Sequence, residues 1–322
     1  NESPEYLDVD GDGTRELLSA TSDDPKANDG PEKYVAITRP AASAEALWKI
    51  TQVSAKNVDM ARKYYHGIGR GDINGDGRND IVTPSGWWQG PAAGETGEWK
   101  FHAATLGGPC AQMHVFDIDG DGDNDVLSSA AHQLGIWWHE QTPAGFTTHE
   151  IDKSFSQTHA LCVVDLNGDG LLDFVTGKRY WAHGPKGDVN PGDPAVLYWF
   201  EAARKDGKPS WTAHKIDDDS GVGTQFVVQD ISGDGLHDIA VANKKGVFTF
   251  RPASSSAAAA TTSVHSSASM LVHHSAMSSA RSRAHSVAAA LVSGSARSST
   301  FLAMVPKNPG RTALEMMFLR LP

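Results

Sequence analysis

The stretch Asp117-Ile-Asp-Gly-Asp-Gly-Asp-Asn-Asp125 recurs in modified form four more times along this chain of 322 residues. The shared pattern is Asp-x-[Asp/Asn/Ser]-Gly-Asp-Gly-x-x-[Asp/Glu], and its copies occupy residues 8–16, 72–80, 117–125, 165–173 and 230–238. The first residues of consecutive copies are 64, 45, 48 and 65 positions apart. An internal repeat of this length predicts a fold in which one supersecondary unit is used several times.

The segments around each acidic loop have the sequence character of β-strands. Short β-branched runs follow the loops, such as Ile81-Val-Thr and Ile239-Ala-Val. A second marker, an aromatic residue three positions before His or Thr, follows the first four loops at residues 48–51, 99–102, 146–149 and 211–214. Each repeat has room for four strands and almost no helical pattern. The sequence therefore predicts an all-β protein, a β-propeller of four-stranded blades, of which five are recognised.

Each acidic loop offers the oxygen ligands that Ca²⁺ prefers. Ca²⁺ binds six to eight oxygens at about 2.3–2.6 Å, and loop positions 1, 3, 5 and 9 supply side-chain oxygens while position 7 supplies a carbonyl. Glycines at positions 4 and 6 permit the sharp turn. We therefore expect up to five structural Ca²⁺ sites with these side-chain ligands: Asp8, Asp10, Asp12, Glu16, Asp72, Asn74, Asp76, Asp80, Asp117, Asp119, Asp121, Asp125, Asp165, Asn167, Asp169, Asp173, Asp230, Ser232, Asp234 and Asp238.

Three other structures contain comparable acidic loops. An EF-hand needs an acidic residue at position 12, which here is Ser19, Thr83, Ser128, Thr176 or Val241. A dockerin-like repeat continues into a helix, whereas these loops continue into β-branched strands. An ordinary Asp-Gly hairpin turn explains a single copy, but five nine-residue copies favour metal binding.

The loops and the strands around them resemble the FG-GAP/VCBS repeats of integrin-like propellers and of many secreted bacterial proteins. Residues 71–88, 177–188 and 217–225 resemble one bacterial branch of that family. The resemblance covers residues 1–252 and implies calcium in the five loops and secretion or export to the periplasm, without implying one activity. Such propellers usually have seven blades, so five loops suggest that the chain begins inside the family's pattern.

Composition separates residues 1–252 from residues 253–322. The first part has 38 acidic and 22 basic residues, whereas the second has one acidic and six basic residues. The second part is rich in Ser and Ala, so we expect a low-complexity tail that is disordered or foreign to the fold. The net charge of −11 argues against nucleic acid as a partner. No apolar run approaches the roughly 20 residues of a membrane span.

Polar residues recur at the end of the predicted blades opposite the acidic loops. His66 and His159 lie six residues before their loops, and Gln112 and Gln225 lie five residues before theirs. The connections between second and third strands contribute His132, Lys178, Arg179, Tyr180, Lys244 and Lys245. We expect these side chains at the mouth of the central channel, a concave place of the kind where ligands bind.

These observations are compatible with three functions. The favoured prediction is a non-enzymatic, calcium-stabilised and extracytoplasmic module that binds carbohydrate or protein at the channel mouth. The alternative is a carbohydrate lyase or dehydratase, in which Lys178 or Arg179 would neutralise a uronate carboxylate. His66, His159 or Tyr180 would then abstract the adjacent proton. The third is a purely structural module, in which the basic side chains pair with nearby Asp residues.

Overall fold

The computed structural model describes residues 2–24, 26, 30–43, 46–92, 99–252, 270–273, 301–306 and 314–319. The chain divides into two compact units, Asn1–Val272 and His273–Pro322. The described part of the first unit consists of strands and loops, with one 3-10 turn at Asp59–Ala61 (η1). Within the described ranges, no helix has the length and apolar character that crossing a membrane requires.

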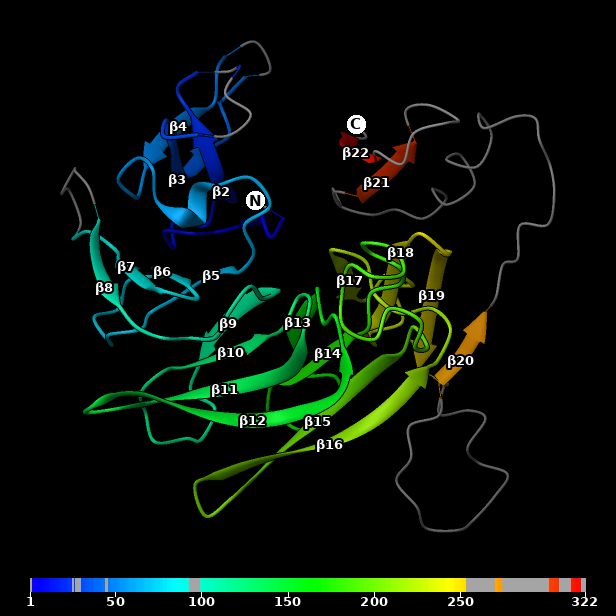
Figure 1. Ribbon diagram of the computed structural model, residues 1–322. Coiled ribbons are helices and arrows are strands. Elements are labelled where there is room, and N and C mark those ends of the chain that lie inside the picture. Colours follow the sequence, from blue (N-terminus) through cyan, green and yellow to red (C-terminus); the bar gives the residue numbers. More distant parts are fainter. Residues whose placement is uncertain are drawn as a thin grey trace. The chain divides into compact units, whose positions relative to one another are not determined.

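Each acidic loop joins the first two strands of a group of four consecutive, antiparallel strands, which we call a blade (Figure 1). Blade 1 contains β1 (Glu5–Leu7), β2 (Glu16–Ser22), β3 (Lys33–Arg39) and β4 (Lys49–Gln52). Blade 2 contains β5 (Ile68–Gly71), β6 (Asp80–Thr83), β7 (Gly86–Gln89) and β8 (Lys100–Ala103). Blade 3 contains β9 (Gln112–Phe116), β10 (Asp125–Ser129), β11 (Leu134–Thr142) and β12 (Gly145–Ser156).

The last two blades follow the same order. Blade 4 contains β13 (Leu161–Val164), β14 (Asp173–Gly177), β15 (Leu197–Lys205) and β16 (Lys208–Asp217). Blade 5 contains β17 (Phe226–Gln229), β18 (Asp238–Asn243), β19 (Gly246–Pro252) and β20 (Met270–His273). The predicted all-β fold of four-stranded propeller blades is confirmed.

The acidic loops turn sharply because both glycines of every loop have a left-handed backbone. Their φ angles lie between +71° and +102°, a region that is accessible to glycine at little cost. The ninth residue of each loop is also the first residue of the second strand of its blade. The loop motif therefore determines where that strand begins.

The first strands of the blades make contacts from one blade to the next. β5 and β9 pair in parallel, with Gly69 opposite Met113, so blades 2 and 3 share one eight-stranded sheet. The amide of Leu161 in β13 donates to Oε1 of Gln112 in β9 at 3.3 Å. Nε2 of Gln225, just before β17, donates to the carbonyl of Pro4 at 2.6 Å. Gln112 and Gln225, which we expected at the channel mouth, thus connect neighbouring parts of the fold.

The hydrophobic core is divided among four clusters that lie between consecutive blades. Neighbouring residues of one second strand enter different clusters, because side chains alternate across a strand. In β10, Val126 packs between blades 2 and 3, and Leu127 packs between blades 3 and 4. In β14, Phe174 and Val175 divide in the same way between the clusters on either side of blade 4. This double-sided burial explains why two consecutive apolar residues follow the ninth loop residue in every second strand.

Most of the predicted tail, residues 253–322, lies outside the described residues. β20 is the neighbour of β19 and forms the outermost strand of blade 5. In the second unit, β21 (Phe301–Pro306) pairs antiparallel with β22 (Leu314–Leu319). The boundary at residue 252 stays a prediction, and β20 is the described segment beyond it that joins a blade.

Replacing Gly69 by alanine tests the parallel contact between blades 2 and 3. A Cβ atom at Gly69 would lie 1.8 Å from the carbonyl oxygen of Met113, so one strand must move. We expect Gly69→Ala to lower the free energy of unfolding by about 1–3 kcal/mol, the usual cost of overpacking. At Gly108 a Cβ atom meets nothing within 4 Å, so Gly108→Ala should change it by less than about 0.5 kcal/mol. Denaturant unfolding measures both, and equal stability of the two variants would contradict the pairing.

Candidate functional site

Each acidic loop wraps its backbone around the carboxylate of its first Asp. In blade 4 the amides of Gly168 and Gly170 donate to the two oxygens of Asp165 at 2.7 and 2.9 Å. Blades 1 and 5 have the same pair of contacts, and blades 2 and 3 have one of the two. The first Asp therefore stabilises the turn, with its carboxylate on the inner side of the loop.

The ninth residue of each loop places a carboxylate in the protein interior. All five of these residues are at most 2% exposed. Each carboxylate accepts the amide hydrogen of the second residue of its loop at 2.9–3.1 Å. Burial raises the pKa of Asp80 to about 6 and that of Asp125 to about 6, because surroundings of low polarity disfavour the charged form. A cation close to these oxygens would offset that cost.

The oxygen atoms of three loops fit the predicted calcium ion. In blade 5 the hydroxyl of Ser232 and Oδ1 of Asp238 are buried without a hydrogen bond to any described residue. Two further loops each bring three carboxylate oxygens within 4.8 Å of one another, from Asp8, Asp10 and Glu16 and from Asp117, Asp119 and Asp125. Clustered oxygen donors on a flexible turn are the ligand set of Ca²⁺.

Basic side chains form ion pairs with carboxylates in the loops of blades 1, 2 and 5, the last between Arg251 and Asp238 at 4.0 Å. Arg39 on β3 forms ion pairs with Asp10 and, at 3.2 Å, with Glu16 in blade 1. In blade 2, Asp76 pairs with Arg78 of its own loop. Along the described residues, no basic side chain forms an ion pair with the carboxylates of the blade 3 loop. The loops therefore differ in the ion pairs that their carboxylates form, although Arg204 donates to the carbonyls of Asp117 and Ile118 in the blade 3 loop.

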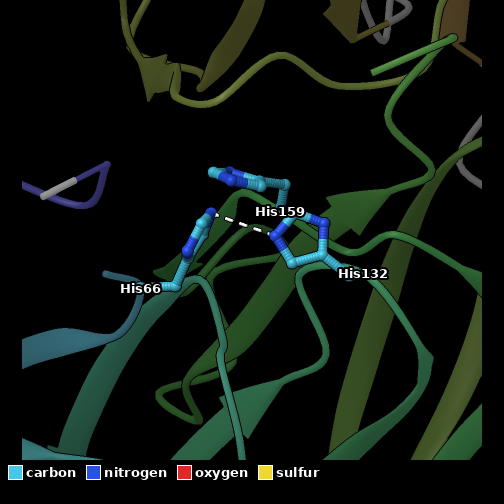
Figure 2. Close-up of side chains that lie close together, drawn as sticks. All are labelled: His66, His132 and His159. Carbon is cyan, nitrogen blue, oxygen red and sulfur yellow. Dashed lines mark hydrogen bonds between the residues drawn. The ribbon is translucent and has the colours of Figure 1, made fainter. Parts of the chain in front are cut away.

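Three histidines from blades 2, 3 and 4 meet at the end of the blades opposite the acidic loops (Figure 2). His66 precedes β5, His132 lies between β10 and β11, and His159 precedes β13. Nε2 of His66 lies 3.2 Å from Nε2 of His132. One nitrogen from each of the three rings lies within 4.8 Å of the other two. The structure thus brings together three side chains that the sequence assigned to this end.

A strained turn places His159 in the cluster. Its amide donates to the carbonyl of Gln157 at 2.8 Å, and Gln157 has φ of +61°, a backbone conformation that costs on the order of 1–3 kcal/mol outside glycine. His159 is fully buried, and neither ring nitrogen makes a hydrogen bond to a described residue. Burial lowers the pKa of His159 to about 4. The ring is therefore neutral near pH 7 and has a free lone pair.

Sequence analysis missed Glu2, which adds a carboxylate to the three histidines. Its Oε2 lies 3.3 Å from Nε2 of His66, 3.3 Å from Nε2 of His159 and 3.7 Å from Nη1 of Arg179. The neighbouring His159 and His66 rings hold the pKa of Glu2 below its ordinary value. Glu2 lies six residues before its loop, as His66 and His159 do. This shared spacing of six residues before the loop is the signal by which Glu2 could have been found.

The long connection between β14 and β15 contributes a second unpredicted carboxylate. Nδ1 of His132 and Nδ1 of His183 each lie 2.9 Å from Oδ1 of Asp188. Burial lowers the pKa of His132, and a carboxylate accepts hydrogen bonds only, so Nδ1 of the neutral ring holds the hydrogen. Nε2 of His132 then faces His66 with its lone pair. Asp188 lies in a connection that is longer than the corresponding connections of the other blades, so periodicity could not identify it.

Lys178 and Arg179 follow β14 and are buried next to this cluster. They are 1% and 7% exposed, and burial lowers the pKa of both side chains. Nζ of Lys178 and both Nε and Nη2 of Arg179 have no hydrogen-bond partner among the residues that the structure describes. The amide of Arg179 donates to the carbonyl of Gln157 at 3.0 Å, which fixes its backbone. Buried cations with unsatisfied donors are costly unless a ligand completes them.

The remaining predicted residues make other contacts. Nζ of Lys244 donates to the carbonyls of Trp181 and Ala182 at 2.8 and 2.9 Å. Lys245 pairs with Asp219, and its Nζ lies 4.9 Å from the centre of the Tyr180 ring. Lys245 therefore has the local Asp partner that the purely structural alternative predicts, whereas Lys178 and Arg179 make no hydrogen bond to an Asp in the described chain.

A separate pocket of about 340 Å³ lies beside the acidic loops of blades 3 and 4. Phe116, Leu172, Arg204 and Trp211 line part of it, and Arg204 donates to the carbonyl of Ile118. Its lining includes neither His nor Lys. The histidine cluster is therefore the stronger candidate for a functional site.

Comparisons with known proteins give one family match and several structural similarities. No curated protein matches the chain. Among solved structures, the chain is similar to an Agrocybe aegerita lectin that recognises non-reducing terminal N-acetylglucosamine, at 16% identity and a TM-score of 0.45. It is also similar to the V. cholerae biofilm matrix protein Bap1, at 16% identity and a TM-score of 0.33. The similarities cover 75% and 79% of this chain but only 62% of the lectin and 35% of Bap1.

The family match falls on blades 3 and 4. A family model described as an FG-GAP-like repeat matches residues 117–176. This range begins at the acidic loop of blade 3 and ends in β14 of blade 4. The matched residues thus contain two of the five acidic loops and the strands around them, and this part of the chain matches the FG-GAP-like repeat that its sequence resembles.

Proposed function

We propose that this protein is an extracytoplasmic β-propeller, stabilised by calcium, that binds an acidic carbohydrate through Lys178 and Arg179. The proposal rests on these two buried cationic side chains, because Nζ of Lys178 and both Nε and Nη2 of Arg179 have no described hydrogen-bond partner. Removing a charge from water costs several kcal/mol, which only close opposite charges and hydrogen bonds repay. A carboxylate on a ligand would supply both the charge and the acceptors.

The contacts of Glu2 support a carboxylate as the recognised group. One oxygen of Glu2 lies within 3.3–3.7 Å of two imidazoles and the Arg179 guanidinium. Arg179 contacts Glu2 through Nη1, so its Nε and Nη2 remain available. A planar guanidinium with two free donors suits bidentate binding of a second carboxylate.

Two exposed aromatic residues next to Arg179 favour a sugar over a simple anion. Tyr180 and Trp181 are 36% and 40% exposed, with ring centres 6.4 Å apart. Trp181 has φ of +48°, and Lys244 holds the carbonyl of this residue. Exposed apolar rings beside buried polar groups are typical of a surface that binds a partner. The strained backbone supports a functional role for this position.

The calcium and export components of the proposal have separate support. The clustered oxygens of blades 1 and 3 and the buried oxygens of blade 5 support calcium. Ion pairs with Arg39 and Arg78 compete with calcium in blades 1 and 2, so we expect the blade 3 loop to bind it most tightly. The proposed extracytoplasmic location is supported by the resemblance to FG-GAP/VCBS repeats of secreted proteins.

Removal of calcium should destabilise the protein. A ligand that binds only the folded state contributes about 2.7 kcal/mol per site at 100 times its Kd, equivalent to a Tm change of about 5–10 °C for a domain of this size. Melting curves with excess Ca²⁺ and with chelator measure the difference, and Mg²⁺ should restore little of it. Asp119→Asn should reduce the calcium-dependent change, whereas Asp206→Asn, in the β15–β16 turn, should not. Identical curves with and without chelator would contradict calcium binding.

Loss of either buried cation should weaken binding of acidic glycans. Lys178→Met keeps the side-chain length and removes an unpaired charge, so stability should stay equal or rise. Hydrogen bonds to charged groups contribute about 1.5–3 kcal/mol, so we expect affinity for polygalacturonate or alginate to fall about 10- to 100-fold. Arg179→Gln should have a similar effect. Lys153→Met, at an exposed lysine that pairs with Glu150 at 2.7 Å, is the matched control.

The same binding assay separates the alternatives. Calorimetric titration of the wild-type protein at low and high salt should show binding to acidic polymers that salt weakens, and no binding to neutral dextran. Binding to acidic peptides instead would indicate a protein partner. An unsaturated, ultraviolet-absorbing product from the polymer would establish a lyase. Absence of binding to every acidic polymer at low salt would refute the proposal.

A further inference from the structure

Four donor atoms, three from the histidine cluster and one from Glu2, lie close to one another. Nε2 of His66 lies 3.2 Å from Nε2 of His132 and 3.3 Å from Oε2 of Glu2, which lies 3.3 Å from Nε2 of His159. Ligands at about 2.0–2.1 Å from a tetrahedral zinc ion lie about 3.3–3.4 Å from one another. Three of the six distances among the four atoms therefore match that spacing.

Hydrogen bonds do not satisfy every donor and acceptor of this cluster. Because His132 donates its Nδ1 hydrogen to Asp188, its Nε2 presents a lone pair to His66. A single hydrogen on Nε2 of His66 cannot point at both His132 and Glu2. Both ring nitrogens of His159 are buried without a hydrogen bond in the described part of the chain. A metal ion would accept a lone pair from every one of these atoms.

We propose that His66, His132 and His159, with Glu2 as fourth ligand, bind one divalent ion of the zinc class. Imidazole nitrogen suits Zn²⁺ and the later first-row metals, whereas Ca²⁺ takes oxygen ligands. The site is therefore distinct in chemistry from the acidic loops, which lie at the other end of the blades. It depends neither on calcium binding nor on the acidic-carbohydrate proposal. The ion connects blades 2, 3 and 4 with the segment that precedes blade 1.

The surroundings of the four ligands suit a dication. The contact from Nδ1 of His132 to Asp188 is the arrangement in which a carboxylate orients a metal-binding imidazole. Glu2 and Asp188 together provide two negative charges, which balance the charge of the ion. Arg179 lies 3.7 Å from Glu2, and its Nε and Nη2 remain unpaired in the described structure. When the metal ion is bound, the Arg179 guanidinium thus remains free for an anionic ligand.

Cobalt substitution tests this site in the presence of the acidic loops. The full-length chain, without a histidine tag, is stripped with chelator, saturated with Ca²⁺ and titrated with Co²⁺ and then Zn²⁺. Tetrahedral Co²⁺ has intense visible ligand-field bands, and Co²⁺ on an oxygen-rich loop does not. We expect these bands to saturate at one equivalent and to disappear when Zn²⁺ displaces Co²⁺.

Variants assign the bands to the proposed ligands. His132→Ala, whose side chain is 23% exposed, and His66→Ala should each abolish them. Asp188→Asn keeps all three nitrogen ligands and should weaken Zn²⁺ binding about 10- to 100-fold. His149→Ala is the matched control, because His149 lies on β12 with its Nε2 2.7 Å from Glu140, and it should bind Co²⁺ like the wild type. Far-ultraviolet circular dichroism checks that each variant is folded.

Two results would overturn the proposal. The first is a wild-type titration without tetrahedral bands, which decides the question even if a histidine variant does not fold. The second is bands of equal intensity in the wild type and in folded His132→Ala. Neither result bears on the affinity for acidic glycans, so the failure of this site and the failure of the proposed function are distinguishable.

Discussion

The buried carboxylate at the ninth position of each acidic loop is the interaction on which the blades depend. It begins the second strand and accepts an amide hydrogen from the start of its own loop. In blades 2, 3 and 4 its other oxygen accepts an amide hydrogen from the third strand or just after it. One side chain thus fixes three backbone segments. A carboxylate is suited to this task because its two oxygens accept several hydrogen bonds at once.

This arrangement gives the two ends of each blade different chemistry. The acidic loops gather at the end where the first strand turns into the second. Antiparallel pairing then brings the segment before the first strand and the connection after the second strand to the opposite end. Glu2, His66 and His159 belong to the first group of segments, and His132, Lys178 and Arg179 to the second. The oxygen-rich loops are therefore apart from the nitrogen-rich cluster, by which we mean the three histidines together with Lys178 and Arg179.

The nitrogen-rich cluster contains several features that folding alone would not favour. Gln157 and Trp181 have left-handed backbones, and Lys178, Arg179 and His159 are buried with unsatisfied polar atoms in the described structure. Strain and unpaired buried charge reduce stability, and they persist where the surrounding structure enforces them. Concentration of these features in one place supports a binding site for both a metal ion and an acidic ligand.

The sequence by itself determined the strands, the loop positions and the end of the blades at which His66, His132, His159, Lys178 and Arg179 lie. Those features depend on local geometry, because a glycine-rich turn and an alternating apolar strand form within a few residues of chain. Only the tertiary structure decided which polar residues meet. Glu2 and Asp188 approach the histidines across gaps of 56 to 157 residues, whereas Gln112 and Gln225 turn to neighbouring backbone. Such contacts depend on how the blades are placed around one another, which no single repeat encodes.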